Sequence, residues 1–172
     1  PSSFAPAPDD ADFGPEQERA VRQMKARIER ERLPAQEDPL FHTKLGRGGL
    51  ADVEWAVQLL QLRHGHGDPA LRSPSTMAAL DALEAAGRVT PTRAAALRAA
   101  YAFCSRLRNR LFLQEGRPRD SLPSDPAAIT RLARSLGYEA GPRAALREDY
   151  RRLARRARRA FEAIFYGEGR PL

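Results

Sequence analysis

The stretch HTKLGRGGLADVEW, from His42 to Trp55, places a cluster of glycines directly before a strongly apolar helical pattern. That pattern begins at Leu50 and continues to about His64. Its apolar residues fall on nearly every side of a helix: Leu50, Val53, Trp55, Val57, Leu59, Leu60 and Leu62. A helix that is apolar nearly all round is normally central to a bundle. The stretch therefore predicts a fold built around a helix over 50–64.

The glycines Gly46, Gly48 and Gly49 lie beside two cations, Lys44 and Arg47. Backbone amides at a helix start can bind phosphate, because glycine lets the chain approach the anion and the helix adds positive potential. The spacing matches neither the P-loop nor the dinucleotide fingerprint. The alternative is a tight turn whose glycines allow positive φ or close packing. Spacing alone favours the turn and leaves a phosphate site open.

Start and stop signals predict further helices on both sides of this segment. Ser73, Thr90 and Asp125 each place a capping side chain before a proline suited to the first helical position. Glycines mark most of the expected ends. The predicted ranges are 15–33, 74–86, 91–115, 126–136 and 142–166. The fold class is all-α, an irregular helical bundle, with one short strand expected over 40–45.

The composition divides the chain into three parts. Residues 1–14 are rich in Pro, Ala, Ser and Asp, and are expected to be a linker or a flexible, disordered lead-in. The bundle domain is predicted over 15–167, followed by a tail over 168–172. The chain begins with Pro1, so we expect a fragment of a longer protein. No apolar run approaches the ~20 residues that span a bilayer, which predicts no membrane contact.

Two acids follow the glycines, but helical geometry separates them. Asp52 and Glu54 are two positions apart, roughly 200° around the helix axis, so they cannot form a paired carboxylate site. Asp52 is expected to satisfy amides at the start of its own helix. Glu54 shares a polar stripe with Gln58 and Gln61 on an otherwise apolar helix. We expect Glu54 to be short of water and to need a cation. Lys44 and Arg47 are the nearest cations in sequence, and a cation from a domain outside this chain is an equal alternative.

The charge balance allows an anionic partner without selecting one. The chain has 29 Lys and Arg against 22 Asp and Glu, a net charge of +7. A run of arginines over 151–159 is expected to be a solvated face partly paired with Glu148 and Glu162. The alternative, a phosphate-backbone contact, is disfavoured because no aromatic residues interleave on that face. Cys104 is expected to be a buried thiol, and no metal site is predicted near His64 and His66.

The segment KLGRGGLADVEWAVQLLQL, from Lys44 to Leu62, resembles the Lys-x-Gly-x-Gly-Gly-x-x-Asp-Ile/Val-Glu-Phe segment of glutamine synthetase adenylyltransferases. Four further stretches are similar to that family: MKARIERE, LPSD, LARSLGY and FEAIFYG. The resemblance runs over most of 15–167. One departure is Trp55, where the family usually has Phe.

The resemblance implies a bifunctional enzyme that uses ATP and Mg²⁺ to attach AMP to glutamine synthetase and also removes it, under control of the PII signal protein. In that family each activity resides in a nucleotidyltransferase domain followed by a helical bundle. The catalytic signature pairs a Gly-Ser dipeptide with downstream aspartates. This chain has no Gly-Ser, and Asp9, Asp10 and Asp12 lie in the lead-in. We therefore expect the helical bundle alone, from the C-terminal half, without catalytic residues and binding no cofactor by itself.

The resemblance also implies roles for the residues around the glycines. Lys44, Arg47, Gly48 and Gly49 are candidate contacts to nucleotide phosphates or to the adjacent nucleotidyltransferase domain. Asp52 and Glu54 are expected at the junction with that domain. A cytoplasmic location follows from the family, and nucleic-acid binding is not expected. The alternative function is a free-standing basic helical module that binds nucleic acid or a protein partner.

Overall fold

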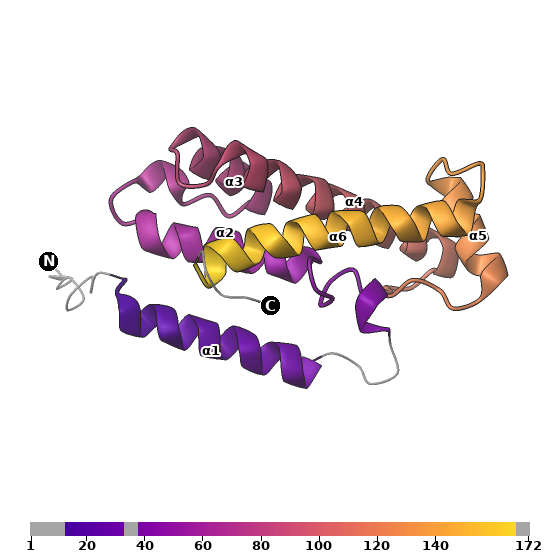
Figure 1. Cartoon of the computed structure of the whole chain (residues 1–172), viewed down its shortest axis with the longest axis horizontal. Coiled ribbons are helices and arrows are strands. Elements are labelled where there is room, and N and C mark those ends of the chain that lie inside the picture. Colours follow the sequence, from indigo (N-terminus) through magenta and orange to yellow (C-terminus); the bar gives the residue numbers. More distant parts are fainter. Residues whose placement is uncertain (1–12, 33–37, 168–172) are drawn as a thin grey trace, which may run out of the picture.

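The computed structural model describes residues 13–32 and 38–167 and is helical through most of them. Six α-helices follow one another along the chain (Figure 1). They are α1 Pro15–Arg32, α2 Leu50–His64, α3 Thr76–Ala85, α4 Pro91–Glu115, α5 Pro126–Ser135 and α6 Pro142–Phe165. Two single 3₁₀ turns, Pro39–Phe41 and Pro69–Leu71, lie on either side of α2. The all-α prediction is confirmed for this part of the chain.

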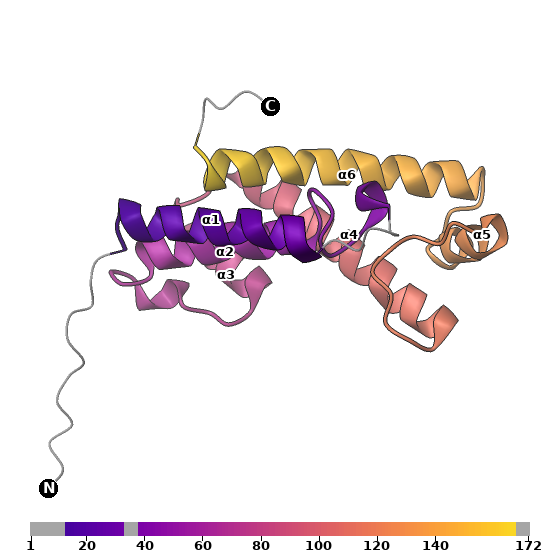
Figure 2. The ribbon, with the colours of Figure 1, turned by 90° about the horizontal axis from the view of Figure 1, so that it is seen from below.

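Helices α2, α4 and α6 form the centre of the molecule (Figure 1). Helix α3 packs on α2 and α4, and α5 packs on α6 and α4 at the opposite end. Helix α1 runs alongside α2, outside the rest of the bundle (Figure 2). The predicted central position of the 50–64 helix is confirmed, since Val53, Ala56 and Leu59 are fully buried.

The core has two parts along the length of α4 and α6. One lies where α2, α3 and the first half of α4 meet the second half of α6, and contains Leu59, Leu80 and Phe161. The other lies between α5, the second half of α4 and the first half of α6, and contains Leu107 and Tyr150. The two long helices therefore hold both ends together.

Two of the three predicted proline-linked caps are confirmed. The side chains of Thr90 and Asp125 accept hydrogen bonds from backbone amides three residues ahead, at the starts of α4 and α5. The predicted cap at Ser73 is wrong, because Ser75 caps α3 instead. The Ser73 hydroxyl accepts from the Ser75 amide and its carbonyl accepts from Gln61, which holds Ser73 outside the helix.

The short strand predicted over 40–45 is wrong. Asp38 caps a 3₁₀ turn over Pro39–Phe41 by accepting from the Leu40 amide. His42 then makes only an isolated antiparallel bridge with Ser121. A strand cannot continue, because the backbone turns sharply at Lys44 toward the glycines.

Phe13, which the sequence predicts to belong to the lead-in, is partly buried against the core. The rest of the expected lead-in, residues 1–12, and the expected tail over 168–172 lie outside the described residues. In the part that the structure describes, none of the helices combines the length and the apolar character needed to cross a membrane.

Candidate functional site

The glycine turn, residues 42–49, directs its backbone amides into the protein. His42 is buried, and its ring Nδ1 accepts hydrogen bonds from the Lys44 and Leu45 amides. Gly46 donates to the His42 carbonyl, and Gly49 donates to the Gly46 carbonyl. The first two amides of α2 donate to the Thr43 and Lys44 carbonyls. Amides that bind their own turn in this way are not available to an outside anion.

Close packing explains why the turn needs glycine. Gly48 has φ +77°, a conformation that side chains rarely adopt, and a Cβ there would lie 2.0 Å from the Ala154 carbonyl oxygen on α6. A Cβ at Gly46 or Gly49 would lie 2.4 or 2.6 Å from carbonyl oxygens within the turn. Gly49 itself has φ −80°, so the positive φ that we considered for the turn falls at Gly48. The glycines fit this turn tightly against α6.

Asp52 joins the turn to α1 and α6. One carboxylate oxygen accepts from the Gly48 amide at 2.7 Å and from the Arg158 guanidinium at 3.0 Å. The other accepts from Lys25 Nζ at 2.7 Å. Asp52 is 1% exposed and Lys25 is 2% exposed. The expectation that Asp52 satisfies an amide near its own helix start is met at Gly48, and buried Lys25 and partly buried Arg158 complete its hydrogen bonding.

Further ion pairs extend from Asp52 to the surface, and together we call them the Asp52 network. Lys25 and Arg158 both contact Glu29, at 2.9 and 3.2 Å. Arg158 also contacts Glu162 at 2.6 Å, and Arg47 reaches the same carboxylate at 3.1 Å. The network consists of three cations and three carboxylates: Lys25, Arg47, Arg158, Glu29, Asp52 and Glu162. Because its charges balance, the network offers little attraction for a phosphate.

Arg158 is the member of this network that crosses between helices. Burial disfavours its charge, but Asp52, Glu162 and Glu29 more than offset this and hold the pKa of the guanidinium above its ordinary value. The guanidinium also lies over the Phe161 ring, 4.9 Å from its centroid. Arg158 therefore stays charged and ties α6 to α1 and α2.

Glu54 lies in a different environment, as the helical spacing predicts. It is half-buried, and burial raises its pKa, which nearby Lys44 and Arg108 oppose. The described residues offer it no hydrogen bond or ion pair within reach. Arg47, one of its two expected partners, pairs with Glu162 instead. Glu54 is thus a partly desolvated carboxylate without a direct partner.

The two remaining candidates, Lys44 and Arg47, are exposed beside the turn. Arg47 borders a cleft of about 530 Å³ between the end of α1, the first 3₁₀ turn and α6. Arg158 and Glu29 line its wall. An anion bound at this surface would contact side chains, because the backbone amides of the turn bond within the turn. Contact of Lys44, Arg47, Gly48 and Gly49 with nucleotide remains a prediction.

Lys25 and Glu29 were not identified from the sequence, and Arg158 was predicted only as part of the arginine run that pairs with Glu148 and Glu162. Lys25 is buried although its neighbour Met24 is exposed, so the apolar residues of α1 do not point to it, whereas Arg158 lies one position after buried Ala157. That position of Arg158 is the only signal that could have singled out either cation. The predicted pairing of the arginine run is confirmed, with Arg155 near Glu148 at 3.6 Å and Arg158 bound to Glu162.

The structure also tests the predictions for the Cys104 thiol and for metal binding. Cys104 is buried as predicted, and burial raises the pKa of its thiol to about 12, so it is not reactive. Among residues 13–32 and 38–167, no group of three or more His, Cys, Asp or Glu side chains is arranged to hold a metal ion.

Comparison with known proteins identifies the family. A family model described as GlnD PII-uridylyltransferase matches residues 20–165. Three curated relatives are each named bifunctional glutamine synthetase adenylyltransferase/adenylyl-removing enzyme. The chain is 49% identical over 155 residues to the one from Streptomyces avermitilis, 46% over 154 to that of Streptomyces coelicolor and 48% over 157 to that of Leifsonia xyli subsp. xyli.

These matches cover 90–91% of this chain but only 15–16% of the relatives. The chain thus spans about a sixth of the length of the curated proteins that it matches. The resemblance drawn from the residues around Gly48 is confirmed by these relatives. The family model covers nearly all of the bundle, from α1 to the last turn of α6. The chain therefore belongs to the GlnD PII-uridylyltransferase family.

Proposed function

We propose that this chain is a helical, non-catalytic segment of a bifunctional glutamine synthetase adenylyltransferase/adenylyl-removing enzyme. The observation that carries the proposal is the 46–49% identity, over nine-tenths of the chain, to three relatives that share that name. The enzyme's substrate is then glutamine synthetase, and its setting the regulation of nitrogen assimilation in the cytoplasm. PII is the signal protein that would govern it.

The chemistry belongs to the adjacent nucleotidyltransferase domain. ATP would be the source of the AMP group there, and Mg²⁺ would supply neutralising charge for its phosphates. The described residues of this chain do not fit Mg²⁺. No step of the reaction is therefore assigned to them.

This chain's own contribution is to hold a rigid surface at the domain junction. The Asp52 network joins α1, α2 and α6 and fixes the glycine turn through the Gly48 amide. The fixed turn presents Lys44 and Arg47 to solvent, and the helix after it presents Glu54. Glu54 is desolvated yet lacks a direct partner, which suits a carboxylate that receives a cation from another domain. Asp52 supports the junction from within, and Glu54 contacts it.

A chimera tests the proposal. The chain replaces the matching segment of the Streptomyces avermitilis enzyme, and incorporation of labelled AMP into glutamine synthetase is measured with ATP and Mg²⁺. We expect incorporation by the chimera and none by the 172-residue chain alone. A second chimera, carrying a helical bundle of unrelated sequence and similar length, should be inactive. Incorporation by the isolated chain, or by the unrelated bundle, would contradict the assignment.

A loss of activity in the first chimera needs one further observation to be decisive. The loss can be assigned to the domain junction only if the chimera still folds. Thermal unfolding of the chimera shows whether it does. A folded chimera without any AMP transfer would contradict the proposal. Salt-sensitive binding of the isolated chain to duplex or single-stranded nucleic acid would favour the alternative, a free-standing basic module.

A further inference from the structure

A groove on the side of α6 opposite α1 belongs to none of the features above. It has a volume of about 850 Å³ and runs between the first half of α4 and the second half of α6. Five alanines form its floor, Ala95, Ala96, Ala99, Ala160 and Ala163, of which Ala95 and Ala99 are exposed; Thr92, Arg93 and Leu153 also line it. Ala95 and Ala99 are four residues apart on α4, and Ala160 and Ala163 are three apart on α6, so the groove follows the helix axes.

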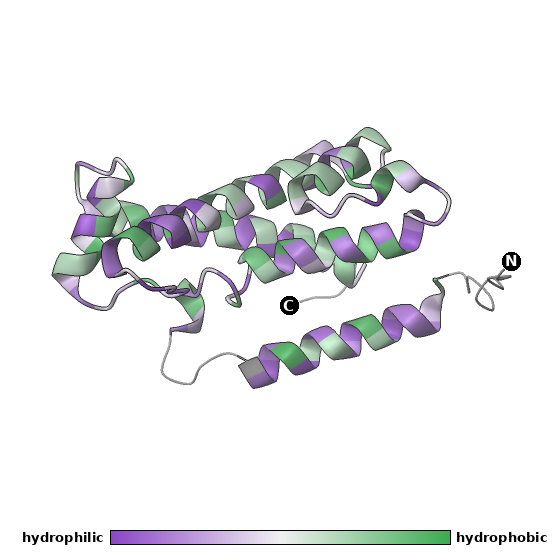
Figure 3. Ribbon diagram, turned by 180° about the vertical axis from the view of Figure 1, so that it is seen from behind, coloured by the Kyte–Doolittle hydropathy of each residue, from purple (hydrophilic) through white to green (hydrophobic). Residues whose placement is uncertain are grey.

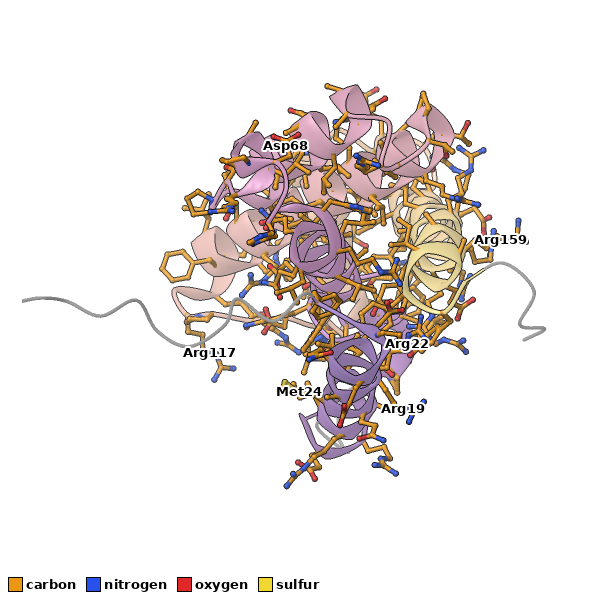
Figure 4. All side chains as sticks on the ribbon, turned by 90° about the vertical axis from the view of Figure 1, so that its left-hand side faces the viewer. Arg19, Arg22, Met24, Asp68, Arg117 and Arg159 are labelled. Carbon is orange, nitrogen blue, oxygen red and sulfur yellow. The ribbon has the colours of Figure 1, made fainter. Side chains whose placement is uncertain are left out.

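The rim of this groove is basic. Arg156 and Arg159 line it and are exposed or partly exposed, and neither has a carboxylate partner among the described residues. Each acid of α6 is already paired elsewhere: Glu148 with Arg155, Asp149 with Arg152, and Glu162 with Arg158 and Arg47. Figure 4 shows Arg159 pointing outward from α6 on the side away from α1. The rim therefore carries uncompensated positive charge.

The floor and the rim together select the occupant. Methyl groups allow a helix axis to approach to about 8 Å, and apolar side chains on that helix would gain by burial there. Carboxylates along its flanks would meet the two arginines. A sugar–phosphate backbone would gain nothing from an alanine floor, and no aromatic residue lines the groove for a base to stack on. The groove thus fits an acidic amphipathic helix better than a nucleic acid.

We infer that the groove between α4 and α6 is the docking site for an acidic amphipathic helix of the same polypeptide, outside the 172 residues. This source rests on the proposed function, because the chain matches only 15–16% of the length of its relatives. The Asp52 network and the groove lie on different sides of α6, since Arg158 and Arg156 are two positions apart, roughly 200° around the axis. The bundle would then contact the rest of the enzyme on two faces.

Cysteine labelling tests the docking in the chain and in the chimera. Ala95→Cys places a thiol in the groove, and Ala127→Cys places a matched control on the exposed side of α5. The native Cys104 is buried and reports folding in both proteins. Maleimide labelling of each thiol is measured by mass spectrometry. We expect the thiol at position 95 to react about tenfold more slowly in the chimera than in the isolated chain. A helix that occupies the groove about nine-tenths of the time would give this protection.

Charge reversal identifies the chemistry of the occupant. Arg156→Glu combined with Arg159→Glu should restore fast labelling at position 95 in the chimera, whereas the control Arg131→Glu on α5 should not. Equal labelling in the chain and the chimera would overturn the inference. Protection that survives the double reversal would equally overturn it, because the occupant would not be acidic. Labelling does not require activity, so an inactive chimera with a protected groove would defeat only the proposed function.

A peptide experiment covers the case in which the chimera does not fold, as rapid labelling of Cys104 would reveal. The probe is a synthetic amphipathic helix of about 20 residues, long enough to be helical in water, with Leu on one face and Glu on its flanks. Added to the isolated chain, it should slow labelling at position 95. A Lys-for-Glu version and a single-stranded oligonucleotide should not. Protection by the oligonucleotide but not by the acidic peptide would overturn the inference in favour of nucleic acid.

Discussion

Asp52 is the residue through which the turn, α1 and α6 are connected. Three groups from three parts of the chain donate to it: the Gly48 amide, Lys25 and Arg158. Each of the three would lose a buried partner if the carboxylate were removed, and an unpaired buried charge is far costlier than an exposed one. The network is therefore required for the native arrangement, whether or not its net contribution to stability is large.

Asp52→Asn should lower the free energy of unfolding by about 3–5 kcal/mol, because it leaves Lys25 and Arg158 short of charge in a buried setting. The matched control is Glu31→Gln, which breaks the exposed Arg27–Glu31 pair of α1. That change should cost at most about 0.5 kcal/mol. Urea unfolding of the two variants measures the difference. Equal losses in the free energy of unfolding would mean that Asp52 contributes no more to stability than an exposed carboxylate.

At the scale of the elements, the sequence predicted those features that depend on local signals. The starts of α4 and α5 follow from Thr90 and Asp125, each followed by proline. The predicted strand over 40–45 is absent because the His42 ring accepts hydrogen bonds from two backbone amides of the turn. No local sequence pattern reveals those hydrogen bonds. The Lys25–Asp52 pair joins residues 27 positions apart. Only the packing of α1 on α2 shows which of the many cations of α1 lies inside.

The turn before α2 gives a prediction with a control in the same chain. Gly48→Ala should destabilise the bundle by several kcal/mol, because the added Cβ would overlap the backbone of α6 and φ is positive. Gly67→Ala should change stability by less than about 0.5 kcal/mol, since nothing lies within 4 Å of its Cβ position. Thermal unfolding compares them. A tolerated alanine at position 48 would show that the turn moves freely away from α6.

Helix α1 is attached mainly by polar contacts. Hydrophilic and hydrophobic residues alternate along it in Figure 3. Arg22 donates to the Phe165 carbonyl at 2.7 Å and lies between α1 and α6 in Figure 4. Arg63 of α2 binds Glu18 at 2.5 Å. Attachment through charged groups makes α1 the helix most sensitive to pH.

Acid should release α1 before the rest of the bundle. Hydrogen bonds from Arg63, with the charges of Arg63 and Arg22, hold the pKa of Glu18 below its ordinary 4.5. The stability that Glu18 contributes is therefore complete above pH 4.5 and is lost as pH falls through the lower, folded-state pKa. Amide hydrogen exchange, corrected for its intrinsic pH dependence, should speed up in α1 as pH falls below 4.5. Protection in α4 should persist, and simultaneous loss in both helices would contradict this.

At the scale of the whole molecule, the two acids of the glycine motif lie in different surroundings. The Asp52 network holds the glycine turn from within, while half-buried Glu54 on α2 has no hydrogen bond or ion pair among residues 13–32 and 38–167. The family could be predicted from the residues around Gly48, since that motif lies within the segment matched by relatives with 46–49% identity. Helical spacing also predicted that Asp52 and Glu54 face different ways, but not the pairing of Asp52 with Lys25 and Arg158, because those two cations are distant in the sequence.

The most direct test of this account is a paired measurement on Glu54→Gln, with Glu139→Gln as the control at an exposed position on the loop before α6. Melting of the isolated chain and AMP transfer by the chimera are measured for both. For Glu54→Gln, we predict a melting temperature within about 2 °C of the unchanged chain, together with about a tenfold loss of AMP transfer through misplacement of the junction. Glu139→Gln should alter neither. A Glu54→Gln chain that unfolds at much lower temperature, in a chimera that keeps full activity, would contradict the account.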